Sequence, residues 1–256
     1  MILAIVQARM SSSRLPGKVL KNILGKPVIG YLFERLKCAK RIDKIILATS
    51  INSENDDLCL YIQSLGFDVF RGSEDNVLER YYLSAMKYAA NGIVRITGDC
   101  PLIDPQLCDR LIDEFLEQKV DYAYLTPMFA EGLDCEVLSY SAVKQCYQNA
   151  KLVSECEHVT RYIINHKDQF KIFQLDNSED DSRYRIVLDE QEDFEALRIL
   201  FENYYGKLHP RGHFSDIKQY LDTHPELIKM NARVIRNEGI IKSLQNDKVF
   251  KPEVAP

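Results

Sequence analysis

The chain begins with Met1–Lys18, MILAIVQARMSSSRLPGK, where a short apolar run gives way to a basic, hydroxyl-rich run. The apolar residues from Ile2 to Val6 suit a buried strand and are too few to span a membrane as a helix. The run after them carries Arg9, Arg14 and Lys18 together with three consecutive serines. A buried strand that opens into such a loop, with free backbone N–H groups, is suited to binding a polyphosphate. A solvent-exposed basic loop fits the same composition, so the rest of the chain has to decide between the two interpretations.

The composition is that of an ordinary globular protein, with 46% hydrophobic and 28% charged residues in a chain of 256. The net charge of −5 argues against general nucleic-acid binding, because it would repel a phosphate backbone. A small phosphorylated ligand needs only a local cationic pocket. The chain has no apolar run long enough to cross a membrane and no secretory signal layout at its start, so we expect a cytoplasmic protein without membrane contact.

The seven cysteines are an odd number, and none of them forms a C-x-x-C pair. Cys100 follows Asp99 directly and is a candidate nucleophile, but no base lies beside it in the sequence. Reduced, mostly buried thiols in a cytoplasmic protein are the favoured interpretation.

Strand-like and helix-like segments alternate through the first half of the chain. We expect strands at 2–6, 44–49, 67–70 and 92–97, and helices at 28–39, 54–64, 75–90 and 105–116. Four alternations with short connections predict an α/β fold with a mostly parallel, doubly wound sheet and helices on both faces. The polar loops 9–18, 71–76 and 98–104 would then meet at the carboxyl ends of the strands, where ligands bind in such sheets. This convergence favours the phosphate-binding interpretation of the loop 9–18.

The second half is less regular. We expect strands at 122–126, 136–139, 170–175 and 184–187, helices at 141–149, 155–165 and 192–203, and one further helix in the tail from about residue 215. No linker is long enough to require a second domain. We therefore expect a single domain over 1–256, with residues 207–256 as a C-terminal extension.

Two acidic residues stand at predicted strand ends. Asp99 follows a central strand in the turn Gly-Asp-Cys-Pro-Leu, and Asp189 follows the run 185–188. Two such carboxylates facing a triphosphate would hold Mg²⁺, which prefers one or two carboxylates plus phosphate oxygens and water. The alternative is that each aspartate caps the helix after it. That alternative is stronger for Asp189 than for Asp99, which precedes a proline-bounded loop.

Two histidine positions could suggest a metal site. Glu157 and His158 are adjacent, but H-x-x-x-H spacing is absent there, so a polar helix face is the favoured interpretation. His209 and His213 are four residues apart, but the proline and glycine between them break any helix and argue against a zinc site.

Six segments carry a resemblance to a known family. They are QARMSSSRLPGKVL (7–20), DVFRGSEDNVLERY (68–81), RITGDCPLIDP (95–105), EGLDCEVLS (131–139), EHVTRYI (157–163) and YRIVLDEQEDFE (184–195). Together they resemble the sugar cytidylyltransferases, which include CMP-KDO synthetases, acylneuraminate cytidylyltransferases and the spore coat polysaccharide biosynthesis protein F group. The last group is the most similar. The run SSSRLPGK is nearer the KDO branch, yet Cys100 replaces the glutamate of that branch's Gly-Asp-Glu-Pro, so neither branch's acceptor follows.

The resemblance implies a Rossmann-like nucleotidyltransferase fold and a Mg²⁺-dependent reaction. The enzyme would move CMP from CTP to a sugar acid or related phosphorylated acceptor and release pyrophosphate, for surface polysaccharide or glycoconjugate biosynthesis. It also implies a homodimer, with residues 127–165 as the acceptor and dimerisation segment. The alternatives are a glycosyltransferase that uses a nucleotide-sugar donor, and a non-catalytic nucleotide-binding protein.

Carried over by position, the resemblance implies specific site residues. The nucleotide would be bound by Ala8, Arg9, Ser13, Arg14, Lys18, Arg71, Ser73 and Thr97. Arg14, Lys18 and Asp99 would be catalytic, and Asp99 and Asp189 would hold the metal. The acceptor-side set would be Glu131, Asp134, Glu136, Glu157 and His158.

Overall fold

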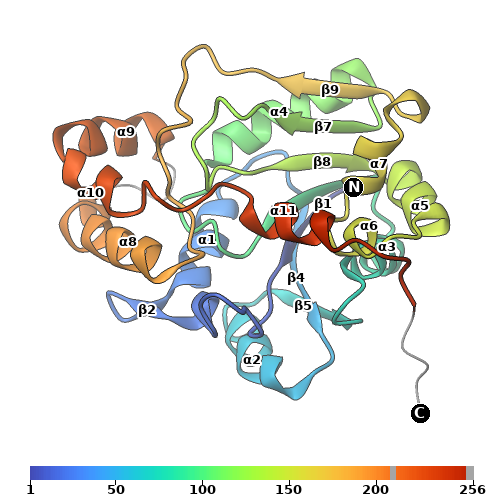
Figure 1. Cartoon of the computed structure of the whole chain (residues 1–256), viewed down its shortest axis with the longest axis horizontal. Coiled ribbons are helices and arrows are strands. Elements are labelled where there is room, and N and C mark those ends of the chain that lie inside the picture. The colour runs from blue at the N-terminus through green and yellow to red at the C-terminus, as the bar shows by residue number, and fades with distance from the viewer. Residues whose placement is uncertain (208–211, 252–256) are drawn as a thin grey trace.

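A seven-stranded sheet organises the chain in the computed structural model, which describes residues 1–207 and 212–251 (Figure 1). Its strands lie in the order β5-β4-β1-β6-β8-β7-β9. Their bounds are β1 Ile2–Gln7, β4 Lys44–Ser50, β5 Asp68–Gly72, β6 Gly92–Thr97, β7 Tyr122–Leu125, β8 Glu136–Ser139 and β9 Ile172–Leu175. All neighbours pair in parallel except β8, which runs antiparallel to both β6 and β7. The expected α/β fold with a mostly parallel sheet is confirmed.

The central strand β1 is apolar throughout because both of its faces are covered. Ala4 and Val6 belong to one apolar cluster, and Leu3 and Ile5 belong to the cluster on the other face. A strand with two covered faces needs a continuous apolar run rather than an alternating one. Complete burial of each large aliphatic side chain contributes about 1.5–3 kcal/mol.

Helices cover both faces of the sheet (Figure 1). Residues of α1 (Val28–Leu36), α2 (Asp56–Ser64) and α4 (Pro105–Gln118) pack into the cluster on one face. Residues of α3 (Val77–Lys87), α5 (Tyr140–Asn149) and α7 (Arg161–Asn165) pack into the cluster on the other. A third cluster lies at the side of the sheet, where α8 (Gln191–Asn203), α9 (Phe214–Thr223) and α10 (Pro225–Met230) pack against the hairpin of β2 (Asn22–Ile23) and β3 (Lys26–Pro27).

Three expectations for the second half are wrong. The helix expected at 155–165 is two short helices, α6 (Val153–Glu157) and α7, separated by Val159 at a φ of 40°, a conformation that a β-branched residue rarely adopts. The strand expected at 184–187 is an extended segment with one isolated bridge, between Arg185 and Glu131. The tail contains three helices rather than one: α9, α10 and α11 (Glu238–Gln245). These segments take their conformations from tertiary contacts, which local periodicity does not encode.

The register of the strands brings the polar loops after β1 and β6 to the same edge of the sheet. Gln7, the last residue of β1, is paired with Thr97, the last residue of β6, and with Ala48 of β4. The loops that follow β1 and β6 therefore leave the sheet side by side, and Gly98 N–H donates to Gln7 O at 2.8 Å. This is the edge at which the sequence predicts the ligand site.

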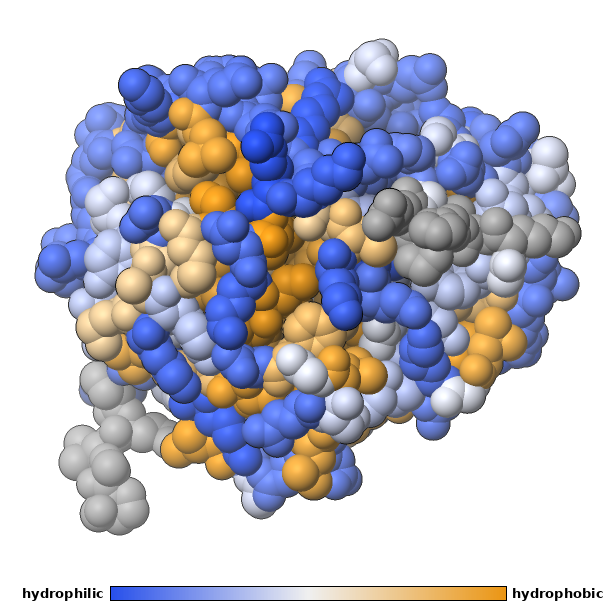
Figure 2. Space-filling view, turned by 180° about the vertical axis from the view of Figure 1, so that it is seen from behind, coloured by the Kyte–Doolittle hydropathy of each residue, from blue (hydrophilic) through white to orange (hydrophobic). Residues whose placement is uncertain are grey.

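The surface is mixed in polarity. On the side opposite to Figure 1, apolar residues gather in the middle of the face, with hydrophilic residues around and across them (Figure 2). None of the helices in the described ranges is long and apolar enough to span a bilayer.

Candidate active site

The basic loop (residues 9–18) is held by two apolar anchors and one tight turn. Leu15 and Val19 are buried, with 7% and 2% of their surfaces exposed. Gly17 adopts a φ of 67°, which favours glycine, and its N–H donates to Met10 O at 3.0 Å. The turn places Lys18 at the start of the 3₁₀ helix η1 (Lys18–Leu20). The two buried side chains and the hydrogen bond from Gly17 to Met10 therefore define the conformation of the loop.

The basic loop lines a cleft of about 270 Å³. The lining residues are Gln7, Ala8, Arg9, Ser12, Ser13, Arg14, Lys18, Val19, Val77, Arg80, Thr97, Gly98, Asp99, Glu157, His158, Asp189 and Gly239. The cleft thus brings together ten of the predicted site residues from four distant parts of the sequence. The predicted residues outside the lining are Arg71, Ser73, Glu131, Asp134 and Glu136.

Lys18 joins the two aspartates that follow the predicted strand ends. Its Nζ donates to Asp99 Oδ2 at 2.6 Å and to Asp189 Oδ1 at 2.7 Å. Backbone pairing aligns the two carboxylates, because Leu188 N–H donates to Asp99 O at 2.9 Å. The expectation that the two side chains meet in space is met, although Asp189 follows an extended segment and not a regular strand.

The mutual contacts fix the charges of this group. Burial alone would raise the pKa of Asp99, but the Lys18 ammonium outweighs it and lowers that pKa to about 2. Burial alone would lower the pKa of Lys18, but the two carboxylates outweigh it and raise that pKa. Only 12% of the Lys18 side chain is exposed, so solvent screens the contact weakly. Asp99 and Lys18 are therefore both charged at neutral pH.

Helix capping does not account for either aspartate. Asp104 caps α4, because its Oδ1 accepts from the N–H groups of Gln106 and Leu107. At the start of α8, Asp193 Oδ2 accepts from the N–H groups of Asp189 and Glu190, both at 3.0 Å. The side chains of Asp99 and Asp189 are therefore available to the cleft.

The two arginines of the basic loop are paired with carboxylates from neighbouring loops. Arg9 Nη1 lies 2.9 Å from Glu74 Oε1, in the loop after β5. Arg14 contacts Asp189 at 3.1 Å, Glu190 at 3.1 Å and Glu238 at 3.6 Å. The predicted convergence of the loops is confirmed by these contacts. An anionic ligand at the cleft would compete with these carboxylates for the same guanidinium groups.

The serine run of the basic loop presents backbone donors. Within the described ranges 1–207 and 212–251, no protein acceptor pairs with the N–H groups of residues 11–14. Consecutive free N–H groups beside fixed cations form an anion-binding concavity. This feature favours a phosphate ligand over a merely solvated loop.

The donor set at Lys18 fits Mg²⁺. Asp99 and Asp189 supply two carboxylates, and magnesium takes one or two of these and completes its shell with phosphate oxygens and water. Over residues 1–207 and 212–251, no three His, Cys, Asp or Glu side chains form a metal-binding group. A magnesium ion held by these two carboxylates would therefore need substrate phosphates or water for its remaining ligands.

Arg71 holds the loop after β4, and Ser73 holds the turn before α3. Arg71 pairs with Asp56 at 2.6 Å and donates to three backbone carbonyls, those of Ser50, Ile51 and Asn52. Ser73 Oγ accepts from Asn76 N–H at 3.1 Å, one turn ahead of α3. Neither side chain reaches the cleft in this structure.

Three members of the acceptor-side set are tied to arginines. Glu131 lies 2.5 Å from Arg185, and burial raises its pKa despite that contact. Glu136 is paired with Arg95 and Tyr122, and accepts from Thr160 Oγ1 at 3.1 Å.

Asp134 is the exposed member of those three. It accepts from Gly132 N–H at 3.0 Å and lies 3.8 Å from Arg236. Gly132 has a φ of 105°, and a Cβ there would lie 2.7 Å from the Ile186 backbone. The turn at Gly-Leu-Asp therefore requires glycine because another backbone passes so close.

The other two members of the set, Glu157 and His158, line the cleft. Glu157 Oε1 lies 3.9 Å from Arg9 Nη2, which also lines the cleft. Burial lowers the pKa of His158, and among the residues that the structure describes its buried Nε2 has no hydrogen-bond partner. Val159, which follows the C-cap His158 of α6, has a φ of 40°. Of the second histidine pair, His209 lies outside the described residues and His213 is 3.8 Å from Asp104.

Sequence reasoning missed two arginines. Arg80 of α3 lines the cleft with 2% of its surface exposed, and it donates to the carbonyls of Ser73 and Glu74. The sequence analysis assigned it no role, because nothing local marks this arginine among the buried residues of α3. Arg185 binds Asp193 at 2.7 and 2.8 Å and approaches Asp189 at 3.6 Å, so it positions the start of α8.

Cys100 is not placed for nucleophilic chemistry. Its side chain is fully buried, and burial together with Asp99 raises its pKa well above the ordinary value. All seven cysteines are free thiols, and six of them are buried. The prediction of reduced, mostly buried thiols agrees with the structure.

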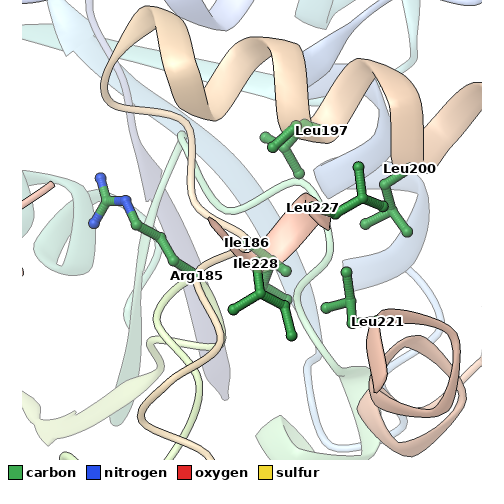
Figure 3. A pocket seen from close by; sticks show the side chains of 8 residues that line it. Arg185, Ile186, Leu197, Leu200, Leu221, Leu227 and Ile228 are labelled. Atoms are coloured by element: carbon green, nitrogen blue, oxygen red, sulfur yellow. The ribbon is translucent and has the colours of Figure 1, made fainter. Parts of the chain in front are cut away.

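A separate small cavity lies among the leucines of α8, α9 and α10 (Figure 3). Its volume is about 10 Å³, room for about one water molecule. Arg185 borders it, but its guanidinium points away from the leucines (Figure 3). This cavity is a packing defect, and the cleft is the candidate active site.

Comparison with known proteins agrees with this geometry. A family profile described as "Cytidylyltransferase" matches residues 3–223. The spore coat polysaccharide biosynthesis protein SpsF of Bacillus subtilis is 34% identical over 210 residues, which cover 78% of this chain and 86% of that protein. A cytidylyltransferase from Leptospira borgpetersenii superimposes with a TM-score of 0.84 at 31% identity, covering 89% of this chain and 96% of that one. The CMP:2-keto-3-deoxy-manno-octonic acid synthetase solved with CTP shares the fold, with a TM-score of 0.61 at 16% identity over 78% and 98% of the two chains. The profile spans all six segments that carry the resemblance, which is thereby confirmed.

Proposed function

The chain belongs to the cytidylyltransferase family, and we propose that it transfers CMP from CTP to a sugar acid or related phosphorylated acceptor. The observation that carries this proposal is the contact of Lys18 with both Asp99 and Asp189 at the end of the basic loop. Lys18 would supply a cation for a triphosphate, and the two aspartates would supply carboxylates for a metal. The activity would serve surface polysaccharide or glycoconjugate synthesis, the role that the name of the Bacillus relative describes.

The reaction is a substitution at phosphorus. An acceptor oxygen attacks the α-phosphorus of CTP, the bond from that phosphorus to the bridging oxygen breaks, and pyrophosphate leaves. Arg9, Arg14 and Lys18 would hold the triphosphate and stabilise the charge that develops on the leaving group, since they line the cleft together. The free N–H groups of residues 11–14 would hold phosphate oxygens. Magnesium, held by Asp99 and Asp189, would neutralise further charge on the phosphates.

The positions of these residues suggest where each substrate would bind in the cleft. The nucleotide would occupy the part lined by Ala8, Arg9, Ser13 and Thr97. The acceptor would approach from the wall that carries Glu157 and His158. Glu131 and Glu136 lie outside the lining, so we propose that they support the acceptor wall through Arg185 and Arg95.

A direct test measures pyrophosphate release from CTP with Mg²⁺ and a panel of sugar acids and phosphosugars. We expect turnover with one acceptor class, a preference for CTP over the other nucleoside triphosphates, and loss of turnover when the metal is chelated. Turnover of a nucleotide sugar in the absence of CTP turnover would instead indicate a glycosyltransferase. The absence of binding to any nucleoside triphosphate would overturn the proposal.

Two further properties stay predictions. We expect a homodimer that involves residues 127–165, which light scattering with size-exclusion chromatography would measure. We also expect the protein in the cytoplasm, which fractionation of cells would measure.

A further inference from the structure

The C-terminal segment 231–251 crosses the cleft. It leaves the group of α8, α9 and α10, carries α11, and ends beside α6 (Figure 1). It lies entirely beyond residue 223, where the match to the family profile ends. We call this segment the strap.

The strap is anchored at its beginning by buried and backbone-directed contacts. Asn231 is 2% exposed, and its side chain donates to Asp193 Oδ1 at 2.9 Å. Arg236 donates to the carbonyls of Pro127 and Phe129 at 2.9 and 3.1 Å. This end of the strap is therefore attached to the rigid body of the domain.

The far end is anchored to the segment around α6. Asp247 accepts from Ser154 Oγ at 2.6 Å and from Ser154 N–H at 3.1 Å. Val153 N–H donates to Lys248 O at 2.9 Å, and Phe250 N–H donates to Lys151 O at 2.7 Å. These bonds form a short antiparallel bridge that holds residues 247–250.

Between the two anchors, α11 is weakly held. The helix has no buried residue, and Ile241 is 44% exposed. Asn237, just before the helix, adopts a φ of 57°, a left-handed conformation that makes a sharp joint after Arg236. Segments with few buried apolar contacts open at low free-energy cost. Helix α11 is thus able to move while both ends of the strap stay attached.

The contacts of α11 at the cleft are polar, and one of them uses a predicted triphosphate ligand. Glu238 Oε2 lies 3.6 Å from Arg14 Nη1, and Gly239 lines the cleft. The other partner of Glu238 is Lys242, at 2.8 Å on the same helix. Ser243 Oγ donates to Glu157 at 3.3 Å. A phosphate group at Arg14 would compete with Glu238 for the guanidinium, and its charge would repel that carboxylate.

We propose that α11 is a movable cover of the cleft, in which Glu238 occupies Arg14 until a polyphosphate displaces it, while the anchors at Arg236 and Asp247 hold. This inference rests on the proposed function, because it takes a polyphosphate as the ligand of the cleft. Lys242 travels with Glu238 when α11 moves, so the helix keeps its own ion pair.

The test uses inorganic triphosphate with Mg²⁺ as the probe, and compares the full chain with Glu238→Gln. We expect the variant to bind triphosphate about two- to fivefold more tightly, the range that a partly exposed ion pair allows. Glu226→Gln is the matched control, since Glu226 is an exposed glutamate on α10. Its affinity should equal that of the wild-type chain.

Hydrogen exchange supplies a second readout. We expect the amides of 238–245 to exchange faster when triphosphate binds, while those of α9 stay unchanged. Asp247→Asn, which weakens the far anchor, should speed exchange in 238–245 without ligand and should tighten triphosphate binding in the same direction as Glu238→Gln.

The outcomes separate the two proposals. Equal affinities for wild type and Glu238→Gln, with unchanged or slower exchange in α11 on binding, would overturn the strap inference and leave the proposed function standing. Failure of the wild-type chain to bind either triphosphate or CTP would overturn both.

Discussion

The basic loop and the acceptor-side set are built in different ways. The loop places its three cations and its free N–H groups within one stretch of ten residues, anchored by Leu15 and Val19. Two carboxylates of the acceptor-side set are instead paired with partly buried arginines that are distant in the sequence, Arg95 and Arg185. The comparison teaches that the loop presents charge to a ligand, whereas much of the other set holds the wall in place. Substitutions in the loop should therefore affect catalysis, and substitutions at the pairs should affect stability.

The largest expected effect is on catalysis at the loop. Lys18→Ala should lower kcat/KM for CTP by about 10²–10³-fold, because it removes a fixed cation from the leaving group and from both aspartates. The measurement is pyrophosphate release, with a thermal melt to verify that the variant is folded. Lys37→Ala, on the exposed end of α1, should match the wild-type chain. A folded Lys18→Ala enzyme with nearly wild-type turnover would remove Lys18 from the catalytic role.

The next effect is on stability at a buried pair. Glu136→Gln should lower the free energy of unfolding by about 3 kcal/mol, because it leaves the Arg95 charge without its carboxylate in a mostly buried place. Urea denaturation measures the change, and Glu117→Gln on the exposed side of α4 is the control. Unchanged stability with a large loss of acceptor affinity would show that Glu136 contacts the acceptor directly.

A smaller effect, about 2 kcal/mol, is expected from the charge of Asp99. Its folded-state pKa of about 2 lies below the ordinary value of 3.8, so its contribution is fully present above about pH 4 and is lost as the pH falls toward 2. The difference in unfolding free energy between wild type and Asp99→Asn should therefore shrink between pH 5 and pH 2. A difference that stays constant over this range would contradict the depressed pKa.

The smallest effect is expected at Arg71. Its partners are Asp56 and backbone carbonyls, and it lies outside the cleft lining. Arg71→Ala should lower stability by less than about 1 kcal/mol and leave KM for CTP within about twofold of the wild-type value. Arg110→Ala, another exposed arginine, is the control. A tenfold rise in KM would restore the role in nucleotide binding that the resemblance implies for Arg71.

The parts that were predictable share one property, which is that their signal is local. The apolar run 2–6 predicts a strand that is buried on both faces. The alternation of strands and helices over the first half of the chain predicts the parallel sheet. The basic loop was recognisable because its three cations fall within the ten residues 9–18. Asp99 and Asp189 were found because strand ends converge, even though the segment before Asp189 is held by Glu131 and Asp99 and not by a regular strand.

The features that the sequence did not predict depend on contacts between residues that are distant in the sequence. Arg80 lies among buried residues of α3. Its guanidinium borders the cleft because it binds the carbonyl of Glu74 in the neighbouring loop, and this contact is visible only in the structure. The tail lacks a long periodic run, so the strap and its contact with Arg14 could not be anticipated.

The sequence by itself determined the fold class, the basic loop and the pair of aspartates, because short-range patterns of apolar and charged residues decide which segments are buried and where strands end. Only the tertiary structure decided which carboxylates face the cleft and which are bound to arginines, and that the C-terminal strap lies across the site. The physical reason is that the charge and position of a side chain in the site depend on its partners in space, and those partners can lie more than two hundred residues away in the sequence, as Glu238 does from Arg14.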